Sequence, residues 1–462
     1  MDTGKLRKAA DTIRILSAEA IQKAKSGHPG MPMGNADYAM VLWAKYMRHN
    51  PADAEWIGRD RFVLSGGHGS MLIYSLLHLF QYGLPMSEIQ NFRQWGSKTP
   101  GHPEHGWTRG VDITTGPLGS GFGSAVGMAI AAKQFAARTG LDKSGLALPR
   151  IFVMCGDGCM MEGNTSEASS LAGHLRLDNI IAFYDDNGIT IEGGTNLAFT
   201  EDVAARYEAY GWRVLRCDDA NDIGKVDAVL AKAVQNDGRP TLIIGKTTIG
   251  FGSPNKGGKS CSHGEPLGEE EVELTKKNLG WTEPPFTVPA EVSAMLDARV
   301  KELEADAAAW NAQYAEFRKT ADSALIDSLL KKTVPDNLLE ELLAAAPVDK
   351  PVASRASSGT ILQKAAQLVP ALVGGAADLA PSTKSDIKNE GGFSADNRAG
   401  RNLHFGIREL EMGMAANGMA LFGGAIPYSS TFAVFSDYMK PAIRLACIQE
   451  LHEIYIFTHD SF

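Results

Sequence analysis

Two short polar segments combine the residue types that a divalent cation bound to a diphosphate requires. Gly156-Asp157-Gly158 follows one apolar run, and Asn187 lies in the turn after the next, 30 residues beyond Asp157 (187 − 157). Aspartate supplies an anionic oxygen and asparagine a neutral one, while glycine lets the backbone approach a phosphate closely. Either segment alone is more simply a turn or a helix cap. Together, at the ends of successive strands, they predict a Mg²⁺ or Ca²⁺ site that bridges the protein and a diphosphate.

Four of the eleven histidines lie beside Gly or Pro in expected loops, where backbone turns expose the imidazole. These are His28, His68, His102 and His263. Titratable side chains on loops of a rigid scaffold are typical of functional sites, whereas most single histidines are surface or satisfied core residues. No comparable signal surrounds His49, His78, His105, His174, His404 and His452.

The scaffold that must position these side chains is indicated by the first 250 residues, which alternate short apolar runs with helical patterns. This alternation is typical of a largely parallel sheet. Expected strands span residues 61–64, 151–154, 180–184 and 241–245, followed by SGGHGS, CGDG, DDNG and FGSPNKGGKSCSHG. Ligands of open parallel sheets bind at the carboxyl ends of the strands. We therefore expect the functional residues in these four loops.

The rest of the chain predicts a helical segment, a linker and a second α/β domain. Residues 288–343 are rich in Ala, Glu, Lys and Leu, and Pro347 and Pro351 then break the pattern. The second α/β pattern ends in the apolar run IYIF, which we expect to be a buried strand. An intact domain rarely ends on a buried strand with nothing packed after it, so we expect the C-terminus to be a truncation. The expected boundaries are 1–325, 326–352 for the helical segment and linker, and 353–462 for the second, incomplete domain.

Composition excludes several classes of function. The chain has 462 residues, a net charge of −9 and a hydrophobic share of 44%, which describe a soluble globular protein with no general attraction to nucleic acid or anionic membranes. It has neither the apolar core of a signal peptide nor a run of about 18 uncharged apolar residues. Five cysteines argue against a disulfide framework, and we expect Cys155 and Cys159 to be buried apolar residues rather than zinc ligands. A cytoplasmic location is predicted.

The Gly-Asp-Gly segment and its distant Asn resemble the cofactor motif of thiamine pyrophosphate enzymes. Over essentially the whole chain the sequence is similar to the transketolase family, with the family's motifs in the family's order. The shared motifs are SGHPG (26–30), FVLSGGHGS (62–70), TPGHPE (99–104), TTGPLGSG (114–121), GDGCMMEG (156–163), SLAGHL (170–175), YDDNGITIEG (184–193), GFGSPNK (250–256), SHG (262–264), ADLAPS (377–382), FGIRE (405–409) and THDS (458–461).

This resemblance implies an α/β thiamine pyrophosphate-binding fold of two consecutive domains, with mostly parallel sheets flanked by helices and the second domain incomplete. It implies reversible transfer of a two-carbon ketol unit from xylulose 5-phosphate or sedoheptulose 7-phosphate to ribose 5-phosphate or glyceraldehyde 3-phosphate. The implied cofactors are thiamine pyrophosphate and Mg²⁺, or Ca²⁺ or Mn²⁺ in its place. A homodimer with active sites at the subunit interface is also implied. Both the pentose phosphate pathway and the Calvin cycle use this reaction, so the pathway stays open.

The resemblance also carries roles onto individual residues. The implied metal ligands are Asp157, Asn187 and the backbone carbonyl of Ile189. The implied cofactor-binding residues are His68, Gly116, Pro117, Leu118, Gly158, Glu162, Asn187, His263, Asp378 and Phe435. The implied substrate-binding residues are His28, His263, Arg355, Ser382 and His459. The implied catalytic residues are Glu409, His28, His263 and His102.

In the second domain the assignments depend on the resemblance more than on local pattern. A carboxylate such as Glu409, just after an apolar stretch, is ordinarily a solvated or paired surface group. Thiamine chemistry, however, needs a carboxylic acid hydrogen-bonded to the aminopyrimidine ring, and Glu409 matches that family position. Phe435 is expected beside the pyrimidine. With Phe432 and Tyr438 it also fits one helix face packed in a core.

Two alternative functions remain open from the sequence. One is a dihydroxyacetone synthase, which shares most of these motifs and uses formaldehyde as the acceptor. The other is a non-catalytic thiamine-fold subunit. The presence of Asp157, Asn187, His28, His263 and Glu409 in one chain speaks against the second alternative.

Overall fold

The computed structural model describes residues 1–347 and 351–460. Its strands are β1 Arg61–Leu64, β2 Ile151–Gly156, β3 Ile180–Asp186, β4 Arg213–Cys217, β5 Thr241–Lys246, β6 Leu372–Ala376, β7 Asn402–His404, β8 Ile426–Phe432 and β9 Ile454–Thr458. The predicted linker includes residues 348–350 and the THDS motif includes residue 461, which lie outside the described residues.

The helices are α1 Thr3–Ala24, α2 Gly30–Gly34, α3 Ala36–Val41, α4 Ser70–Leu79, α5 Met86–Gln90, α6 Ser120–Thr139, α7 Asp157–Met161, α8 Gly163–His174, α9 Val203–Ala209, α10 Ile223–Ala233, α11 Glu269–Asn278, α12 Ala290–Arg318, α13 Ser323–Lys331, α14 Leu338–Ala345, α15 Ser354–Leu368, α16 Ala380–Thr383, α17 Glu409–Phe422 and α18 Ser436–Ile448. Short 3₁₀ or π turns are η1 Leu42–Tyr46, η2 Gly67–Gly69, η3 Leu141–Lys143, η4 Thr195–Leu197, η5 Ser260–Ser262 and η6 Ala433–Phe435. No helix in this part of the chain is both long and apolar enough to span a membrane.

The described residues group into two compact units, each with its own parallel sheet. The first unit comprises residues 1–122, 149–165 and 180–310, and the second comprises 123–148, 166–179 and 311–462. In the first unit the strand order is β1-β2-β3-β5-β4, with every neighbouring pair parallel. Because the strands are parallel, their carboxyl ends meet at one edge of the sheet.

The four strands expected in the first sheet are confirmed. β1 has the predicted bounds, while β2, β3 and β5 each run one or two residues further than predicted. Their side chains are almost entirely buried, as expected for a parallel sheet covered on both faces. The sequence analysis missed β4, an edge strand with two arginines and only one fully buried residue, because its pattern lacks a continuous apolar run.

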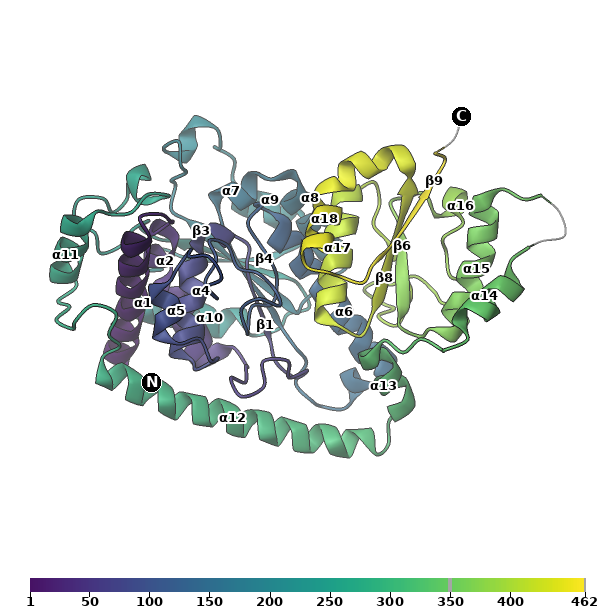
Figure 1. Cartoon of the computed structure of the whole chain (residues 1–462), viewed down its shortest axis with the longest axis horizontal. Helices are drawn as coiled ribbons and strands as arrows, with labels where there is room; N and C mark the ends of the chain where they lie inside the picture. The colour runs from purple at the N-terminus through teal and green to yellow at the C-terminus, as the bar shows by residue number, and fades with distance from the viewer. Residues whose placement is uncertain (348–350, 461–462) are drawn as a thin grey trace. The chain divides into compact units, whose positions relative to one another are not determined.

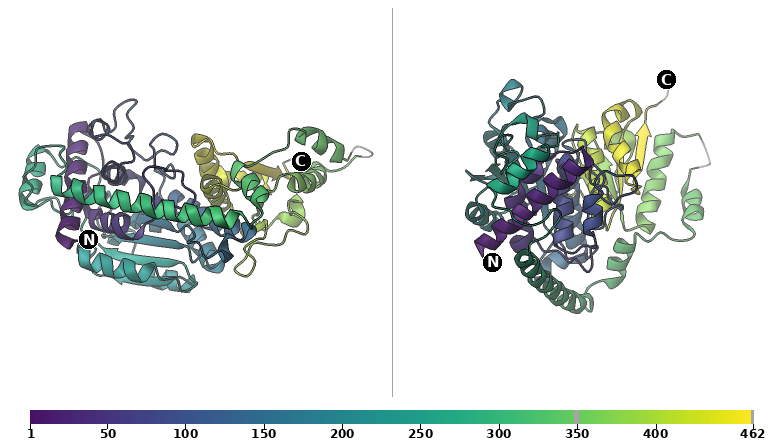
Figure 2. Two further views of the ribbon diagram at one scale, coloured as in Figure 1. Left: turned by 90° about the horizontal axis from the view of Figure 1, so that it is seen from below. Right: turned by 60° about the vertical axis from the view of Figure 1, so that its left-hand side comes forward.

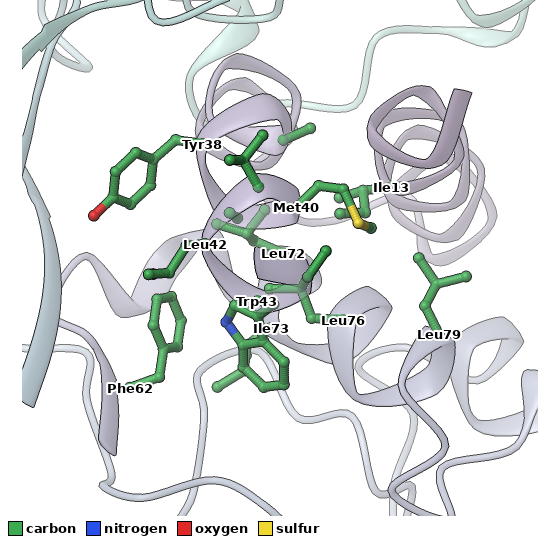
Figure 3. Close-up of a cluster of buried hydrophobic side chains, with 14 of the residues drawn as sticks. Ile13, Tyr38, Met40, Leu42, Trp43, Phe62, Leu72, Ile73, Leu76 and Leu79 are labelled. Carbon is green, nitrogen blue, oxygen red and sulfur yellow. The ribbon is translucent and has the colours of Figure 1, made fainter. Parts of the chain in front are cut away.

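A hydrophobic core fixes the helices of the first unit against β1. Figure 3 shows Trp43 and Leu42 near Phe62 of β1, with Leu72 of α4 and Ile13 of α1 packed around them. The Trp43 and Phe62 ring centroids are 5.6 Å apart with their planes at 76°. Full burial of each such side chain contributes roughly 1.5–3 kcal/mol. This packing holds the start of the SGGHGS loop, which follows β1.

The second unit contains a parallel sheet in the order β7-β6-β8-β9. Figure 1 and the turned views of Figure 2 show the yellow helices α17 and α18 on one face of this sheet and the green helices α15 and α14 on the other. Helix α6 packs tightly on α17. A Cβ at Gly418 would lie 1.8 Å from the Ser124 carbonyl oxygen, so the approach requires glycine at this position.

Two expectations for the second unit are corrected by the structure. The IYIF run forms β9, but its side chains are exposed or half-buried, with Ile454 41% exposed. β9 is the edge strand, so it has a neighbour on one side only. The second correction concerns Phe432, Phe435 and Tyr438, which do not form one face of a helix packed in a core. Phe432 ends β8, Phe435 lies in η6 and Tyr438 in α18 is 65% exposed, because a strand-to-helix turn separates the three.

The helical region predicted over 288–343 is confirmed as α12, α13 and α14. α13 has a clear start and end: the Asp322 carboxylate accepts a hydrogen bond from the Leu325 backbone N–H at 2.9 Å, and Lys332 closes the helix in the left-handed conformation. Cys155 and Cys159 are buried, as expected.

Candidate functional site

A hollow of about 480 Å³ opens at the carboxyl ends of the first unit's strands. Its size is within the range typical of small-molecule and cofactor sites. The sequence-predicted residues that line it are His28, His68, Gly116, Leu118, Asp157, Gly158, Glu162, Asn187, Ile189 and His263. The expectation that the loops after β1, β2, β3 and β5 carry the site is confirmed for seven of these residues, whereas His28 comes from the loop after α1, and Gly116 and Leu118 come from the loop before α6.

Asp157 is the most buried carboxylate with an unsatisfied oxygen in this hollow. It is 4% exposed and begins α7 directly after β2. The Tyr184 hydroxyl donates to Asp157 Oδ1 at 2.5 Å, whereas Oδ2 is buried without a partner among the described residues. Burial, together with the nearby Asp185 and Asp186, raises the pKa of Asp157 to about 7, against the hydrogen bond from Tyr184. A cation beside Oδ2 would offset the free-energy cost of burying the charged carboxylate.

Asn187 is oriented by a buried carboxylate next to it. Its Nδ2 donates to Asp185 Oδ2 at 2.9 Å, and its Oδ1 accepts from the Ile189 backbone N–H at 2.9 Å. Asp185 also accepts from Asn35 Nδ2 at 2.8 Å and from the Thr247 hydroxyl. The orientation of Asn187 is therefore set by a network across β3 and β5, and its Oδ1 keeps a lone pair for a further ligand.

The loop before α6 faces the Gly-Asp-Gly segment across the hollow. A Cβ at Gly158 would lie 2.6 Å from Leu118 Cδ1, so glycine there permits the close approach. The Ser120 hydroxyl donates to the Pro117 carbonyl at 2.6 Å and holds the turn. A Cβ at Gly116 would lie 3.4 Å from the His102 ring, which places His102 against this loop. His102 lines a neighbouring surface hollow and not the one that contains Asp157.

Three of the four predicted histidines form a cluster. The ring centroids of His28 and His68 are 5.2 Å apart, those of His28 and His263 are 5.9 Å apart, and those of His68 and His263 are 5.1 Å apart. Burial, followed by the Arg93 charge, lowers the pKa of His28 to about 4. Burial, followed by His263 and His28, lowers the pKa of His68 to about 3. Burial also lowers the pKa values of His263 and His102. The cluster therefore presents neutral imidazoles at neutral pH.

The second unit contains the other predicted site residues, in more open surroundings. Asp378 has a left-handed backbone, with φ of 61°, and lines a hollow of about 660 Å³ with Arg408 and His404. Glu409 begins α17 and is partly buried. The rings of Phe432 and Phe435 are stacked with centroids 5.8 Å apart.

Arg355 and Ser382, predicted to bind the substrate phosphate, and His459, predicted to bind substrate, come from neighbouring elements. Arg355 lies in the first turn of α15, Ser382 in α16 and His459 directly after β9, and all three are exposed. α16 packs against both α15 and β9. The Thr458 hydroxyl and His459 Nδ1 are 2.8 Å apart, and the His459 ring centroid lies 4.0 Å from that of Phe432.

The sequence analysis missed residues whose contribution depends on three-dimensional contact. Tyr184 and Asp185 orient the expected metal ligands, and the only sequence signal was their position at the end of an apolar run beside Asn187. Glu411 was also missed. It is fully buried in α17, both its carboxylate oxygens lack hydrogen-bond partners among the described residues, and burial beside Glu167 raises the pKa of its carboxyl well above the usual range.

No group of three or more His, Cys, Asp or Glu side chains arranged to hold a metal ion occurs in residues 1–347 and 351–460. The ligand set expected from the sequence contains one carboxylate, one amide and one backbone carbonyl, with the remaining ligands coming from a diphosphate. The coordination shell of the cation would therefore be complete only when the diphosphate is also bound.

Comparison with known families gives matches over nearly the whole chain. The family described as "Transketolase, thiamine diphosphate binding domain" matches residues 6–335, and "Transketolase, pyrimidine binding domain" matches residues 350–462. Curated transketolases from Halalkalibacterium halodurans and Bacillus subtilis are 52% and 50% identical. In each case the match covers 98% of this chain, and it covers 68% and 69% of the respective relative.

Solved structures agree with these sequence matches. A transketolase from Leishmania mexicana has a TM-score of 0.95 at 40% identity, covering 99% of this chain and 68% of that one. A Pichia stipitis transketolase in complex with sedoheptulose 7-phosphate has a TM-score of 0.94 at 42% identity, covering 99% and 69%. These relatives support neither the formaldehyde-accepting synthase nor the non-catalytic subunit as an alternative.

Proposed function

The chain belongs to the transketolase family and has transketolase activity, and we propose that it moves a two-carbon ketol unit from a ketose phosphate to an aldose phosphate. Xylulose 5-phosphate and sedoheptulose 7-phosphate are the proposed donors, and ribose 5-phosphate and glyceraldehyde 3-phosphate the proposed acceptors. The observation that supports the site most strongly is the buried Asp157 with its unpartnered Oδ2, at the carboxyl end of β2.

The residues of the hollow that contains Asp157 fit thiamine pyrophosphate with a divalent cation. Asp157 Oδ2, Asn187 Oδ1 and the Ile189 carbonyl are the proposed cation ligands, with Mg²⁺ as the first choice and Ca²⁺ or Mn²⁺ as substitutes. Gly158 leaves the backbone open toward a diphosphate. His68, Gly116, Leu118, Glu162 and His263 line the same hollow and are the proposed cofactor contacts, with Pro117 holding the turn.

When bound, thiamine pyrophosphate supplies the carbon nucleophile that carries the two-carbon unit. The chain's own residues bind, orient and move protons around it. We assign His28, His263 and His102 to substrate hydroxyls and proton transfer, consistent with their lowered pKa values.

In the second unit we assign Glu409 to hold a proton at the pyrimidine ring of the cofactor, with Asp378 and Phe435 beside that ring. Arg355 and Ser382 are the proposed contacts of the substrate phosphate, and His459 is a proposed contact of the substrate. An arginine fork and a hydroxyl are suitable donors to phosphate oxygens.

We further propose a cytoplasmic homodimer whose active sites lie at the subunit interface, built from a diphosphate-binding domain at 1–325, a helical segment and linker at 326–352 and a pyrimidine-binding domain at 353–462. The matches of two transketolase domain families to successive parts of the chain support the proposed order of the two domains. Sedimentation equilibrium would reveal a monomer if the dimer proposal is wrong.

The function is tested by two measurements on the same protein. Calorimetry should detect thiamine pyrophosphate binding with Mg²⁺ present and little binding after chelation with EDTA. A ketol-transfer assay should then give product from xylulose 5-phosphate and ribose 5-phosphate. High turnover with formaldehyde as the acceptor, beside low turnover with ribose 5-phosphate, would contradict the proposed substrate class.

A further inference from the structure

Arg93 is a charged residue that the mechanism above does not use, and it lines the surface hollow of His102 next to the proposed cofactor hollow. It follows α5 in the loop that leads to His102, and its guanidinium is half-buried. Nη1 donates to the Ser26 hydroxyl at 2.8 Å, and Nη2 is 3.3 Å from His28 Nδ1. Among the described residues no carboxylate lies within ion-pair distance of this guanidinium.

The surrounding structure holds Arg93 in this position at a conformational cost. Its φ is 60°, in the left-handed region that is unfavourable for residues with a Cβ, and its backbone N–H donates to the Thr99 carbonyl at 2.9 Å. A Cβ at Gly101 would lie 3.0 Å from Arg93 Nε, so glycine leaves room for the guanidinium. Arg93 Cζ lies 5.4 Å from the Phe92 ring centroid. Strained backbone of this kind is typical of residues with a functional constraint.

The contact with Arg93 determines which ring nitrogen of His28 carries the proton. An arginine guanidinium is always a donor and never an acceptor, so His28 Nδ1 must accept with its lone pair. The ring proton must then be on Nε2, at the other side of the ring. A second proton on Nδ1 would face the guanidinium charge, which disfavours the imidazolium form.

The remaining nitrogen of His28 is open to a ligand. A Cβ at Gly264 would lie 3.3 Å from His28 Nε2, so glycine leaves space beside it. No hydrogen-bond partner for Nε2 occurs among the described residues, and His28 lines the proposed cofactor hollow. The other titratable groups around the ring are His68, His263 and His102, of which His263 and His102 also disfavour a positive charge on His28.

We infer that Arg93 is a positioning residue that fixes His28 as the neutral Nε2–H tautomer, so that His28 donates a hydrogen bond to a substrate oxygen and does not accept a proton from a substrate hydroxyl. The substrate part of this inference rests on the proposed function. It refines the role of His28 from proton transfer in general to donation at one atom. Other groups of the site must then accept the proton from the substrate hydroxyl.

The inference is tested by NMR on protein labelled with ¹⁵N-histidine, without cofactor or substrate, so that failure of the proposed function does not affect the result. Two-bond ¹H–¹⁵N correlations distinguish the two tautomers, and loss of a signal in His28→Asn assigns His28. The wild type should show Nε2–H from pH 7.5 down to about pH 5, without protonation. An Nδ1–H tautomer in the wild type would overturn the inference without any further variant.

The variant Arg93→Met tests whether Arg93 determines the tautomer of His28. Methionine keeps a long unbranched side chain but has neither the positive charge nor the hydrogen-bond donors of arginine. The tautomer populations of His28 should become mixed, and its titration midpoint should rise toward the ordinary value. Arg109→Met is the matched control, since Arg109 in the same region donates only to the carbonyls of Tyr82 and Ala52. Unchanged tautomer and midpoint in a folded Arg93→Met protein would show that Arg93 does not set the state of His28.

Discussion

The two units hold their candidate site residues in opposite ways. In the first unit Asp157 and Asp185 are 4% and 2% exposed, and both are tied into hydrogen bonds with neighbouring strands and loops. In the second unit Arg355, Ser382 and His459 are exposed and lie on or beside three separate elements, α15, α16 and β9.

This difference follows from what each group must do. A buried carboxylate is costly unless it is paired, so the first unit's network fixes the positions of a few oxygens before any ligand arrives. Exposed cationic and hydroxyl side chains carry little such cost, and they remain free to order around a phosphate when one binds. The comparison predicts loss of binding from changes in the first unit and changes in rate or apparent substrate affinity from changes in the second.

The largest expected effect is on cofactor binding in the first unit. Asp157→Ala should weaken metal-dependent thiamine pyrophosphate binding by more than about 100-fold, because it removes the proposed anionic ligand of the cation. Asp186→Asn is the control, because it changes a carboxylate at the end of the neighbouring strand β3 that pairs with Lys246. Calorimetry with Mg²⁺ measures both, and unchanged affinity in a folded Asp157→Ala protein would refute the assignment.

The next effect is on turnover and belongs to the second unit. Glu409→Gln keeps the size of the side chain and a hydrogen-bond donor but cannot exchange a proton with the ring as a carboxyl group does. The value of kcat and hydrogen–deuterium exchange at C2 of the bound cofactor should fall by roughly 10²- to 10⁴-fold, with KM comparatively unaffected. The exposed Asp437→Asn serves as the control. Equal exchange rates would show that Glu409 is not the activating acid.

The fold was largely predictable because its strands are short apolar runs bounded by glycine-rich loops. The strands at 61–64, 151–156, 180–186 and 241–246 carry a local signal, since each is buried on both faces. β4 and the exposure of β9 were not predictable in this way. An edge strand is defined by the neighbour that it lacks, which is a property of the assembled sheet.

The candidate site was predictable to the extent that its residues lie at strand ends. Asp157, Asn187 and His68 were found because parallel strands bring their carboxyl-terminal loops to one edge. Arg93 and Tyr184 were not found, because their contributions arise from contacts with residues distant in the sequence. Glu409 and Arg355 were identified through family resemblance alone, since nothing in their local patterns separates them from surface charges.

A smaller effect is expected at the phosphate end of the substrate. Arg355→Ala should raise KM for phosphorylated sugars by roughly 10- to 150-fold, the equivalent of one hydrogen bond to a charged group, with a smaller change in kcat. Lys364→Ala is a control on the same helix, where Lys364 pairs with Glu341. Steady-state kinetics with donors bearing and lacking a phosphate separate the two cases. If KM for phosphorylated donors does not change, Arg355 does not bind the phosphate.

The smallest expected effect is on the pH dependence of folding stability, through a buried histidine of the first unit. His49 in the first unit is 1% exposed, with Nδ1 3.0 Å from the Tyr82 hydroxyl and Nε2 3.1 Å from the Trp43 carbonyl. Burial lowers the pKa of His49 to about 4, while the unfolded chain binds this proton near pH 6.5. In the described part of the second unit, His404 is an exposed counterpart.

The sign of the pH effect follows from proton linkage. Below about pH 6.5 the unfolded chain binds the His49 proton and the folded chain does not, so this contribution to stability is lost as pH falls toward 4. Between pH 7.5 and 5.5 the loss is roughly 1.4 kcal/mol in the free energy of unfolding. His49→Gln should remove that part of the pH dependence, whereas His404→Gln should leave it unchanged. Urea unfolding of the three proteins at both pH values measures the difference, and an equal pH dependence in His49→Gln and wild type would contradict the prediction.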